Sequence, residues 1–164
     1  TEKVQKLREE IPDIVLRTTL ITGFPGETEE DHETLMEFVD EMEFDRLGVF
    51  TYSAEEDTPA ASMEGQIPEE VKEERRDALM ELQQEVSYDK GSERIGQELL
   101  VMIEGKVSGE SAYIARTYGD APKVDGYIFV QTGELLVTGD FAKVRVTGAM
   151  EYDLIGELAD EYTE

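Results

Sequence analysis

The segment Ile14–Thr28 constrains the fold of this chain more than any other. It reads IVLRTTLITGFPGET, a run rich in Val, Ile and Thr that meets the turn Gly23-Phe24-Pro25-Gly26. β-branched residues favour a strand, whereas Gly and Pro end one. Thr28 and the three acidic residues after it are typical of a helix start, and a second apolar run at 46–53 follows one helix length later. This order predicts two parallel strands joined through a helix, with the turn at the strand end where α/β folds bind ligands.

Two further helices are predicted in the first part of the chain. Apolar residues recur at helical spacing over residues 2–10, and Pro12 ends that run. A longer apolar stripe begins after Pro68 and continues to about residue 90, where Gly91 is expected to end the helix. Two parallel strands are too few for a sheet covered on both faces. We therefore expect residues 1–92 to be the carboxyl-terminal portion of a larger α/β domain whose earlier strands are missing.

The composition changes near residue 93, where short β-like runs begin to alternate with glycine turns. These features predict a small antiparallel β-barrel or sandwich over residues 93–158, followed by an acidic tail at 159–164. The five expected strands are residues 99–103, 113–117, 127–131, 143–147 and 152–155.

Composition excludes several functional classes. The chain has 40 acidic and 15 basic residues among 164, for a net charge of −25, and it has no cysteine and one histidine. Such a field repels nucleic acid and attracts basic partners. The alternative is that the acidic residues only keep the chain soluble. The residue types exclude a disulfide framework and a cysteine metal site, so no metal site is predicted. No apolar run is long enough to span a membrane and no signal segment opens the chain, so a cytoplasmic location is expected. The first residue, Thr1, suggests a piece of a longer protein.

Four segments, in this order, resemble the carboxyl-terminal portion of the radical S-adenosylmethionine methylthiotransferases. They are LRTTLITGFPGETEED (16–31), FDRLGVFTYSAEEDTPA (44–60), IPEEVKEERRDALMELQQEVS (67–87) and DAPKVDG (120–126). Within that family the chain is most similar to the enzymes that methylthiolate an aspartate of a small-subunit ribosomal protein. The resemblance implies that residues 1–92 are the carboxyl-terminal portion of a TIM-like radical S-adenosylmethionine barrel. It also implies that a TRAM domain, an OB-like β-barrel, follows at 93–158.

The resemblance also implies S-adenosylmethionine and two 4Fe-4S clusters in the full-length enzyme, both held through cysteines. This chain has none, so by itself it is expected to be inactive and to bind none of these cofactors fully. It is expected to retain only parts that support the cofactor and dock the substrate.

The first strand and its turn supply the predicted cofactor-binding residues. Strand alternation places Arg17 and Thr19 on one face, and because that face is the more polar we assign it to the barrel interior. An arginine there needs an anion, which could be a cofactor, a substrate or a barrel carboxylate. Gly23 and Gly26 permit close backbone approach. The family pattern places an acid where Gly26 stands, so Glu27 is interpreted as a helix cap together with Thr28.

Two other polar positions receive structural interpretations. Tyr52 and Ser53 end the second strand at the same rim and are interpreted as packing and turn residues. His32, early in an acidic helix, is interpreted as a solvated surface residue.

The β-barrel supplies the predicted docking residues. Residues 95–164 carry five Lys and Arg against 13 Asp and Glu, a balance that disfavours RNA and suits a basic ribosomal protein. Arg116, Tyr118, Asp120 and Asp125 share one loop region and are the candidates for substrate docking. The alternative is a loop ordered only for folding. Two other functions stay open, a transfer-RNA methylthiotransferase and a non-enzymatic protein-binding module.

Overall fold

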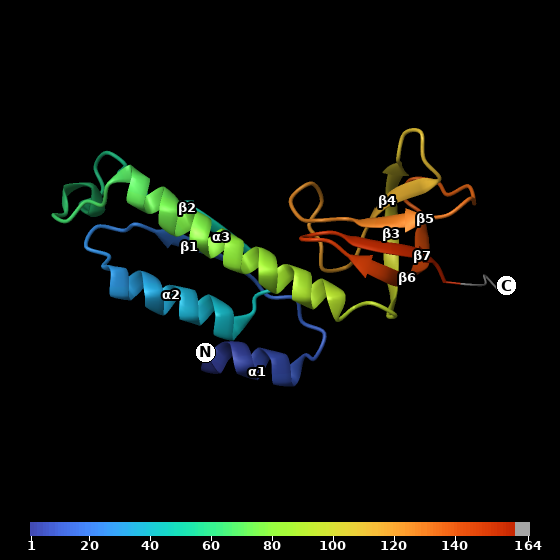
Figure 1. Ribbon diagram of the computed structural model, residues 1–164, viewed down its shortest axis with the longest axis horizontal. Coiled ribbons are helices and arrows are strands. Elements are labelled where there is room, and N and C mark those ends of the chain that lie inside the picture. Colours follow the sequence, from blue (N-terminus) through green and yellow to red (C-terminus); the bar gives the residue numbers. More distant parts are fainter. Residues whose placement is uncertain (160–164) are drawn as a thin grey trace. The chain divides into compact units, whose positions relative to one another are not determined.

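The computed structural model describes residues 1–159 and divides the chain into two compact units (Figure 1). The amino-terminal unit is Thr1–Val86 and the carboxyl-terminal unit begins at Ser87. Of the expected acidic tail, residues 160–164 lie outside the described residues. The predicted mixed fold, a parallel strand pair with helices followed by a small β-barrel, is confirmed.

The amino-terminal unit follows the predicted order of elements. Helix α1 (Glu2–Glu10) precedes strand β1 (Arg17–Thr22), helix α2 (Glu29–Met42) and strand β2 (Arg46–Thr51). A 3₁₀ turn, η1 (Pro59–Ser62), leads to the long helix α3 (Glu69–Ser92). Strand β1 begins three residues later than the β-branched run, because residues 14–16 precede the ladder with β2.

Strands β1 and β2 form a parallel two-stranded sheet with helices packed on one face. Arg17 is in register with Arg46, and Ile21 is in register with Phe50. Val39 of α2, Val49 of β2 and Leu79 of α3 form the buried core between sheet and helices. Since side chains alternate along a strand, the other parity points away from these helices, and both Ile21 and Phe50 remain about 60% exposed.

Helix α3 does not end at Gly91, where the sequence predicted its end. Gly91 lies inside it and the helix continues to Ser92. A Cβ atom at Gly91 would lie 3.2 Å from the Cβ atom of Ala149 and 3.4 Å from Leu154. The residue is therefore small because of close packing within the carboxyl-terminal unit, and it does not mark the end of the helix.

The carboxyl-terminal unit is a closed five-stranded barrel in the order β3-β4-β5-β7-β6. The strands are β3 (Glu98–Lys106), β4 (Ala112–Arg116), β5 (Ile128–Gln131), β6 (Phe141–Ala149) and β7 (Leu154–Leu158). The expected purely antiparallel arrangement is wrong, because β5 and β7 are parallel. A ring with an odd number of strands cannot alternate in direction throughout, so closure with five strands requires one parallel pair.

Inward-pointing apolar side chains fill the barrel. Its buried core comprises Val101, Ile103, Tyr113, Ala115, Ile128, Val130, Ala142, Val144 and Val146. Strand β6 shows the alternation most clearly, with buried and exposed residues in turn from Phe141 to Thr147. Gly156 of β7 faces this core, and a Cβ atom there would overlap Val144 and lie 2.8 Å from the carbonyl oxygen of Arg145. The interior thus leaves no room for a side chain at this position.

Candidate functional site

The turn after β1 is held by backbone hydrogen bonds at a strand end. Gly23 and Gly26 both have positive φ angles, 75° and 87°, which glycine adopts without strain. The N–H group of Gly26 donates to the carbonyl oxygen of Gly65 at 2.9 Å, and the N–H group of Glu27 donates to that of Phe24 at 2.9 Å. The turn therefore has a defined conformation before any ligand is considered.

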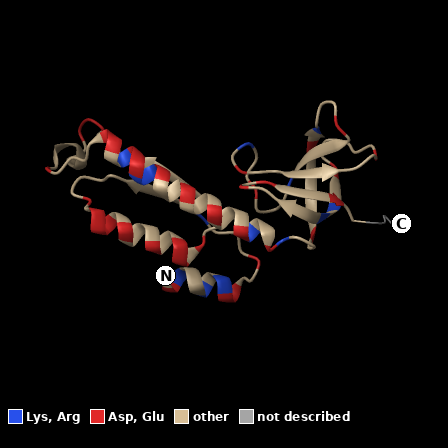
Figure 2. Ribbon diagram, viewed as in Figure 1, with Lys and Arg blue, Asp and Glu red and all other residues tan. Residues whose placement is uncertain are grey.

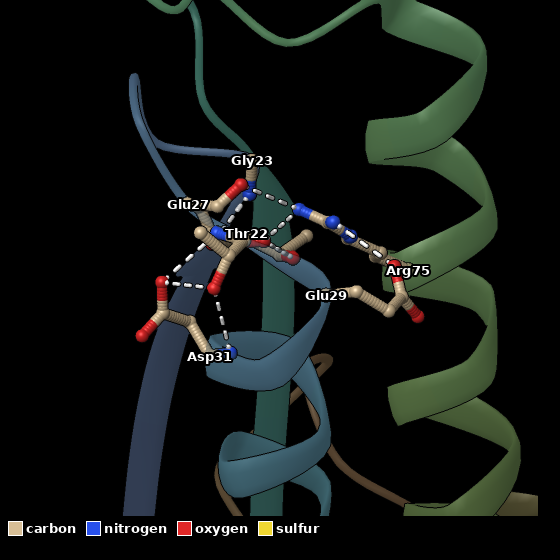
Figure 3. A network of polar contacts seen from close by, with 7 residues as sticks. Thr22, Gly23, Glu27, Glu29, Asp31 and Arg75 are labelled. Carbon is tan, nitrogen blue, oxygen red and sulfur yellow. Dashed lines mark hydrogen bonds and ion pairs between the residues drawn. The ribbon is translucent and has the colours of Figure 1, made fainter.

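Glu27 ties this turn to helix α3 (Figure 3). Its carboxylate accepts the Gly23 N–H at 2.8 Å and the Thr22 hydroxyl at 3.3 Å. The same carboxylate pairs with Arg75 of α3 at 2.7 Å, and the two side chains are only 12% and 8% exposed. Arg75 also pairs with Glu29 at 3.1 Å. Although burial acts in the opposite direction, the hydrogen bonds to Glu29 and Glu27 raise the pKa of the Arg75 guanidinium.

The interpretation of Glu27 as a helix cap is wrong, whereas that of Thr28 is confirmed. Thr28 and Asp31 form a capping box, in which the Thr28 hydroxyl accepts the Asp31 N–H and the Asp31 carboxylate accepts the Thr28 N–H at 2.9 Å. These bonds lower the pKa of Asp31, with the Thr28 backbone N–H as the largest cause. Because Asp31 completes the cap, Glu27 is left to bind Gly23 and Arg75.

A second buried cation of α3 reaches the end of β2. The ammonium group of Lys72 donates to the carbonyl oxygen of Tyr52 at 2.9 Å and to Glu69 at 2.7 Å. It lies 5.7 Å from the centre of the Tyr52 ring. The aliphatic part of Lys72 fills the space next to Gly23. Helix α3 therefore contacts the ends of both strands through two long basic side chains.

Sequence reasoning missed Lys72 and Arg75, although their spacing carried a signal. The buried positions of α3 in the amino-terminal unit are Lys72, Arg75, Leu79, Gln83 and Val86. Intervals of three and four residues place them along one helix face. Extending the buried face backward from Leu79 by four and then three residues would have found both cations.

The predicted cofactor-binding residues lie in different surroundings. Arg17 and Thr19 are exposed on the sheet face opposite the helices, as the strand alternation predicted. Gly23 is buried, its N–H binds Glu27 and its open side is filled by Lys72. Gly26 is exposed, and a Cβ atom there would meet no atom within 4 Å. Of the two glycines, only Gly26 leaves space for a ligand, and the cofactor role of all four residues stays a prediction.

Two aromatic residues meet at the same rim. The rings of Phe24 and Tyr52 are in edge contact at 5.3 Å between centroids. The Tyr52 hydroxyl is buried and has no hydrogen-bond partner among the described residues.

His32 is 7% exposed, so its interpretation as a solvated residue is wrong. The helix that carries His32 is acidic, but this side chain points to the buried side.

Two carboxylates of the loop predicted to dock the substrate form hydrogen bonds within that loop. Asp120 is buried and accepts the N–H and the hydroxyl of Thr117 at 3.1 and 2.6 Å. Asp125 accepts the N–H of Ala121 at 2.6 Å. These bonds support the alternative that both carboxylates order the loop. Tyr118, in contrast, is 66% exposed.

Arg116 belongs to the wall of the barrel. It ends β4 and pairs with Glu104 of β3 at 2.7 Å, with both side chains about one quarter exposed. Its charge is therefore neutralised locally. The docking roles of Arg116, Tyr118, Asp120 and Asp125 stay predictions.

The surface charge is predominantly negative in both units (Figure 2). Helix α2 carries seven acidic residues and no Lys or Arg. The described part of the barrel, residues 95–159, contains ten acidic and five basic residues. Two of those five, Arg116 and Arg145, form ion pairs with Glu104 and Glu98. The barrel therefore offers few unneutralised cations to a polynucleotide.

The described residues form neither a membrane-spanning helix nor a cluster of metal ligands. Within residues 1–159, no helix combines the length and the apolar character needed to cross a membrane. The same residues contain no group of three or more His, Asp or Glu side chains placed to hold a metal ion.

Comparison with known proteins identifies the barrel first. The TRAM domain family matches residues 95–159, which cover β3 to β7. Across nearly the whole chain, several proteins named ribosomal protein uS12 methylthiotransferase RimO are similar to it. The protein of Lachnoclostridium phytofermentans is 60% identical over 93% of this chain, and that of Pelotomaculum thermopropionicum is 56% identical over 94%. The protein of Clostridioides difficile is 46% identical over 97%.

The chain corresponds to the carboxyl-terminal part of RimO proteins. The predicted resemblance is therefore confirmed. The match covers 35% or 36% of the length of the three relatives. The chain thus spans about one third of the curated RimO proteins that it matches, and it contains no cysteine.

Proposed function

We propose that this chain is the part of a RimO enzyme that supports the cofactor and docks the substrate. The parent enzyme would methylthiolate an aspartate of ribosomal protein uS12 by radical S-adenosylmethionine chemistry. One observation carries the proposal, namely the identity of 46–60% over 93–97% of the chain to three proteins named uS12 methylthiotransferases.

The iron–sulfur clusters do not fit this chain. Such clusters are held by cysteine thiolates, and the sequence has none. Both 4Fe-4S clusters of the parent would therefore be held by other parts of it. Accordingly, we expect this chain alone to be inactive as a methylthiotransferase.

S-adenosylmethionine fits, in part, the exposed face of β1 and the turn that follows this strand. In the proposal, the exposed side chains of Arg17 and Thr19 and the open backbone at Gly26 would contact it. An arginine guanidinium suits a carboxylate such as that of the cofactor's methionyl group. Gly23 would act indirectly, since its N–H already binds Glu27. When bound, the cofactor supplies the radical that removes a hydrogen atom from the substrate.

The charge of the TRAM barrel supports a basic protein as the partner. A surface that binds RNA needs clustered Lys and Arg with exposed aromatic rings. Here acidic residues outnumber basic ones two to one, and two of the five basic residues are already paired. A transfer-RNA substrate, the second candidate, would meet net repulsion. A ribosomal protein rich in Lys and Arg would be attracted instead.

Binding measurements at two salt concentrations test the proposal. We expect the chain to bind purified uS12, with an affinity that falls as salt is raised, and to bind transfer RNA far more weakly. A charge-reversal variant of exposed barrel acids, such as Glu157→Lys, should weaken uS12 binding. Tight, salt-sensitive binding to transfer RNA with none to uS12 would favour the second candidate.

Activity measurements separate the enzyme from a non-enzymatic binding module. The full-length parent with both clusters reconstituted should add a methylthio group to uS12, detected by intact mass. The present chain, given the same reagents, should add none. A parent that binds uS12 but never modifies it would support the module.

A further inference from the structure

The ion pair between Glu27 and Arg75 connects two elements that are distant in sequence. Arg75 lies 48 residues after Glu27, yet its guanidinium reaches the carboxylate at 2.7 Å in a site where both side chains are nearly buried. Figure 3 shows the arginine extending from α3 toward the end of β1. Taking both charges out of water costs several kcal/mol per ion. Apolar residues of similar size could pack α3 on the sheet without that cost.

The carboxylate performs a task that an apolar residue could not. It accepts the N–H of Gly23 and the hydroxyl of Thr22, where the chain leaves the sheet. These two donors lie at the last residue of β1 and the first residue of the turn. A buried N–H group that loses its acceptor destabilises the fold, because it has given up its hydrogen bond to water. Glu27 therefore fixes the direction in which the turn departs, and Arg75 fixes Glu27.

The surroundings leave this pair little freedom. Glu29 holds the second nitrogen of the Arg75 guanidinium at 3.1 Å. On the neighbouring turn of α3, Lys72 packs beside Gly23 and binds the Tyr52 carbonyl. Contacts that involve the end of β1, Glu29 of α2, and Lys72 and Arg75 of α3 therefore hold the turn in place.

We propose that Arg75 is a positioning residue for S-adenosylmethionine, acting through Glu27 on the turn Gly23–Gly26. This inference rests on the proposed function, because it assumes that the cofactor contacts the carboxyl end of β1. Arg75 itself is buried against Glu27 and Glu29 and does not touch the ligand. Its role is to keep the exposed backbone at Gly26 and the ring of Phe24 in the conformation that the cofactor meets.

The test compares variants in the full-length parent with its clusters reconstituted, using this chain's numbering. Arg75→Gln removes the pair, and Glu27→Gln removes the charge while keeping an oxygen that can accept the Gly23 N–H. Arg76→Gln is the matched control, because Arg76 is the next residue of α3 and pairs with its exposed neighbour Asp77, away from Glu27. Equilibrium dialysis measures the Kd for S-adenosylmethionine. Steady-state kinetics measure KM for the cofactor and for uS12 separately.

We expect Arg75→Gln to raise the Kd for the cofactor at least tenfold, while KM for uS12 changes less than twofold. Glu27→Gln should raise the Kd by a smaller factor, and Arg75→Lys should recover part of the loss. Arg76→Gln should bind like the parent. Hydrogen exchange of the Gly23 amide in the present chain should accelerate in Arg75→Gln and not in Arg76→Gln.

Two outcomes overturn the inference. In the first, Arg75→Gln and Glu27→Gln fold and bind the cofactor within twofold of the parent. In the second, KM for uS12 rises as much as KM for the cofactor, which would indicate a general structural role. If Arg75→Gln does not fold, the Kd of Glu27→Gln decides. Failure of the proposed function looks different, because the unsubstituted parent would then bind no S-adenosylmethionine.

Discussion

Gly23 and Lys72 pack so closely that a Cβ atom on the glycine would overlap the Cγ atom of the lysine and lie 2.8 Å from its Cδ atom. The lysine is held in place, because its ammonium group binds the Tyr52 carbonyl and Glu69. Two separate features therefore favour glycine at this strand end. The first is the positive φ angle of Gly23, and the second is the lysine side chain packed beside it. Gly26, three residues later, has a positive φ angle but no side chain packed beside it.

This difference predicts unequal effects of alanine at the two glycines. Gly23→Ala should destabilise the amino-terminal unit by about 2–4 kcal/mol, because overpacking adds to the strain of a left-handed backbone. Gly26→Ala should cost only about 1 kcal/mol from that strain. Urea unfolding of the two variants beside the parent chain measures the difference. Equal losses would mean that Lys72 moves aside without cost.

The capping box at α2 predicts a pH dependence. The bonds from Thr28 lower the pKa of the Asp31 carboxyl below its ordinary value of 3.8. Because the folded pKa is the lower one, the carboxylate's contribution to stability is fully present above pH 3.8. It is lost as the pH falls through the folded value.

An NMR titration of the Asp31 carboxyl measures this pKa directly. The Thr28→Ala variant, which lacks the hydroxyl but keeps the backbone N–H, should move the pKa part of the way back. Titration of Asp31 at or above 3.8 in the parent chain would contradict the assigned bonds.

Local patterns predicted most of the fold because each element carries its own signal. The helix start at Thr28, the parallel strands and the five barrel strands all follow from residue type and spacing. The errors concern contacts between residues distant in sequence. Gly91 is small because Ala149 and Leu154 pack against it, and nothing near Gly91 indicates this.

The candidate site shows the same division. Strand alternation predicted that Arg17 and Thr19 share a face, which depends only on β1. The partner of Glu27 lies 48 residues away, so local reasoning assigned that carboxylate to the nearest helix end. The prediction that His32 is solvated was wrong for a related reason. The acidic residues around it do not indicate which face of α2 packs against the rest of the protein.

The barrel interior predicts a strong effect at Gly156. A Cβ atom at Gly156 would overlap Val144 and approach the Arg145 carbonyl oxygen. Gly156→Ala should therefore lower the free energy of unfolding of the barrel by about 1–3 kcal/mol. Gly133→Ala is the control, since a Cβ atom there meets nothing within 4 Å, and it should change stability by less than about 0.5 kcal/mol. Thermal unfolding followed by circular dichroism distinguishes the two, and equal melting temperatures would argue against the packing described at Gly156.

Two buried tyrosines predict opposite responses to loss of the hydroxyl. The Tyr113 hydroxyl donates to the Glu134 carbonyl and accepts the Leu136 N–H, each at 3.2 Å. Tyr113→Phe should therefore cost about 1 kcal/mol or more, because it leaves the Leu136 N–H without its acceptor. The Tyr52 hydroxyl has no partner among the described residues, so Tyr52→Phe removes a buried polar group that gains nothing. We expect Tyr52→Phe to leave stability unchanged or to raise it by up to about 1 kcal/mol, while the ring keeps its contacts with Phe24 and Lys72. Urea titrations of both variants test this contrast, and a loss at Tyr52 as large as that at Tyr113 would mean that its hydroxyl binds an ordered water.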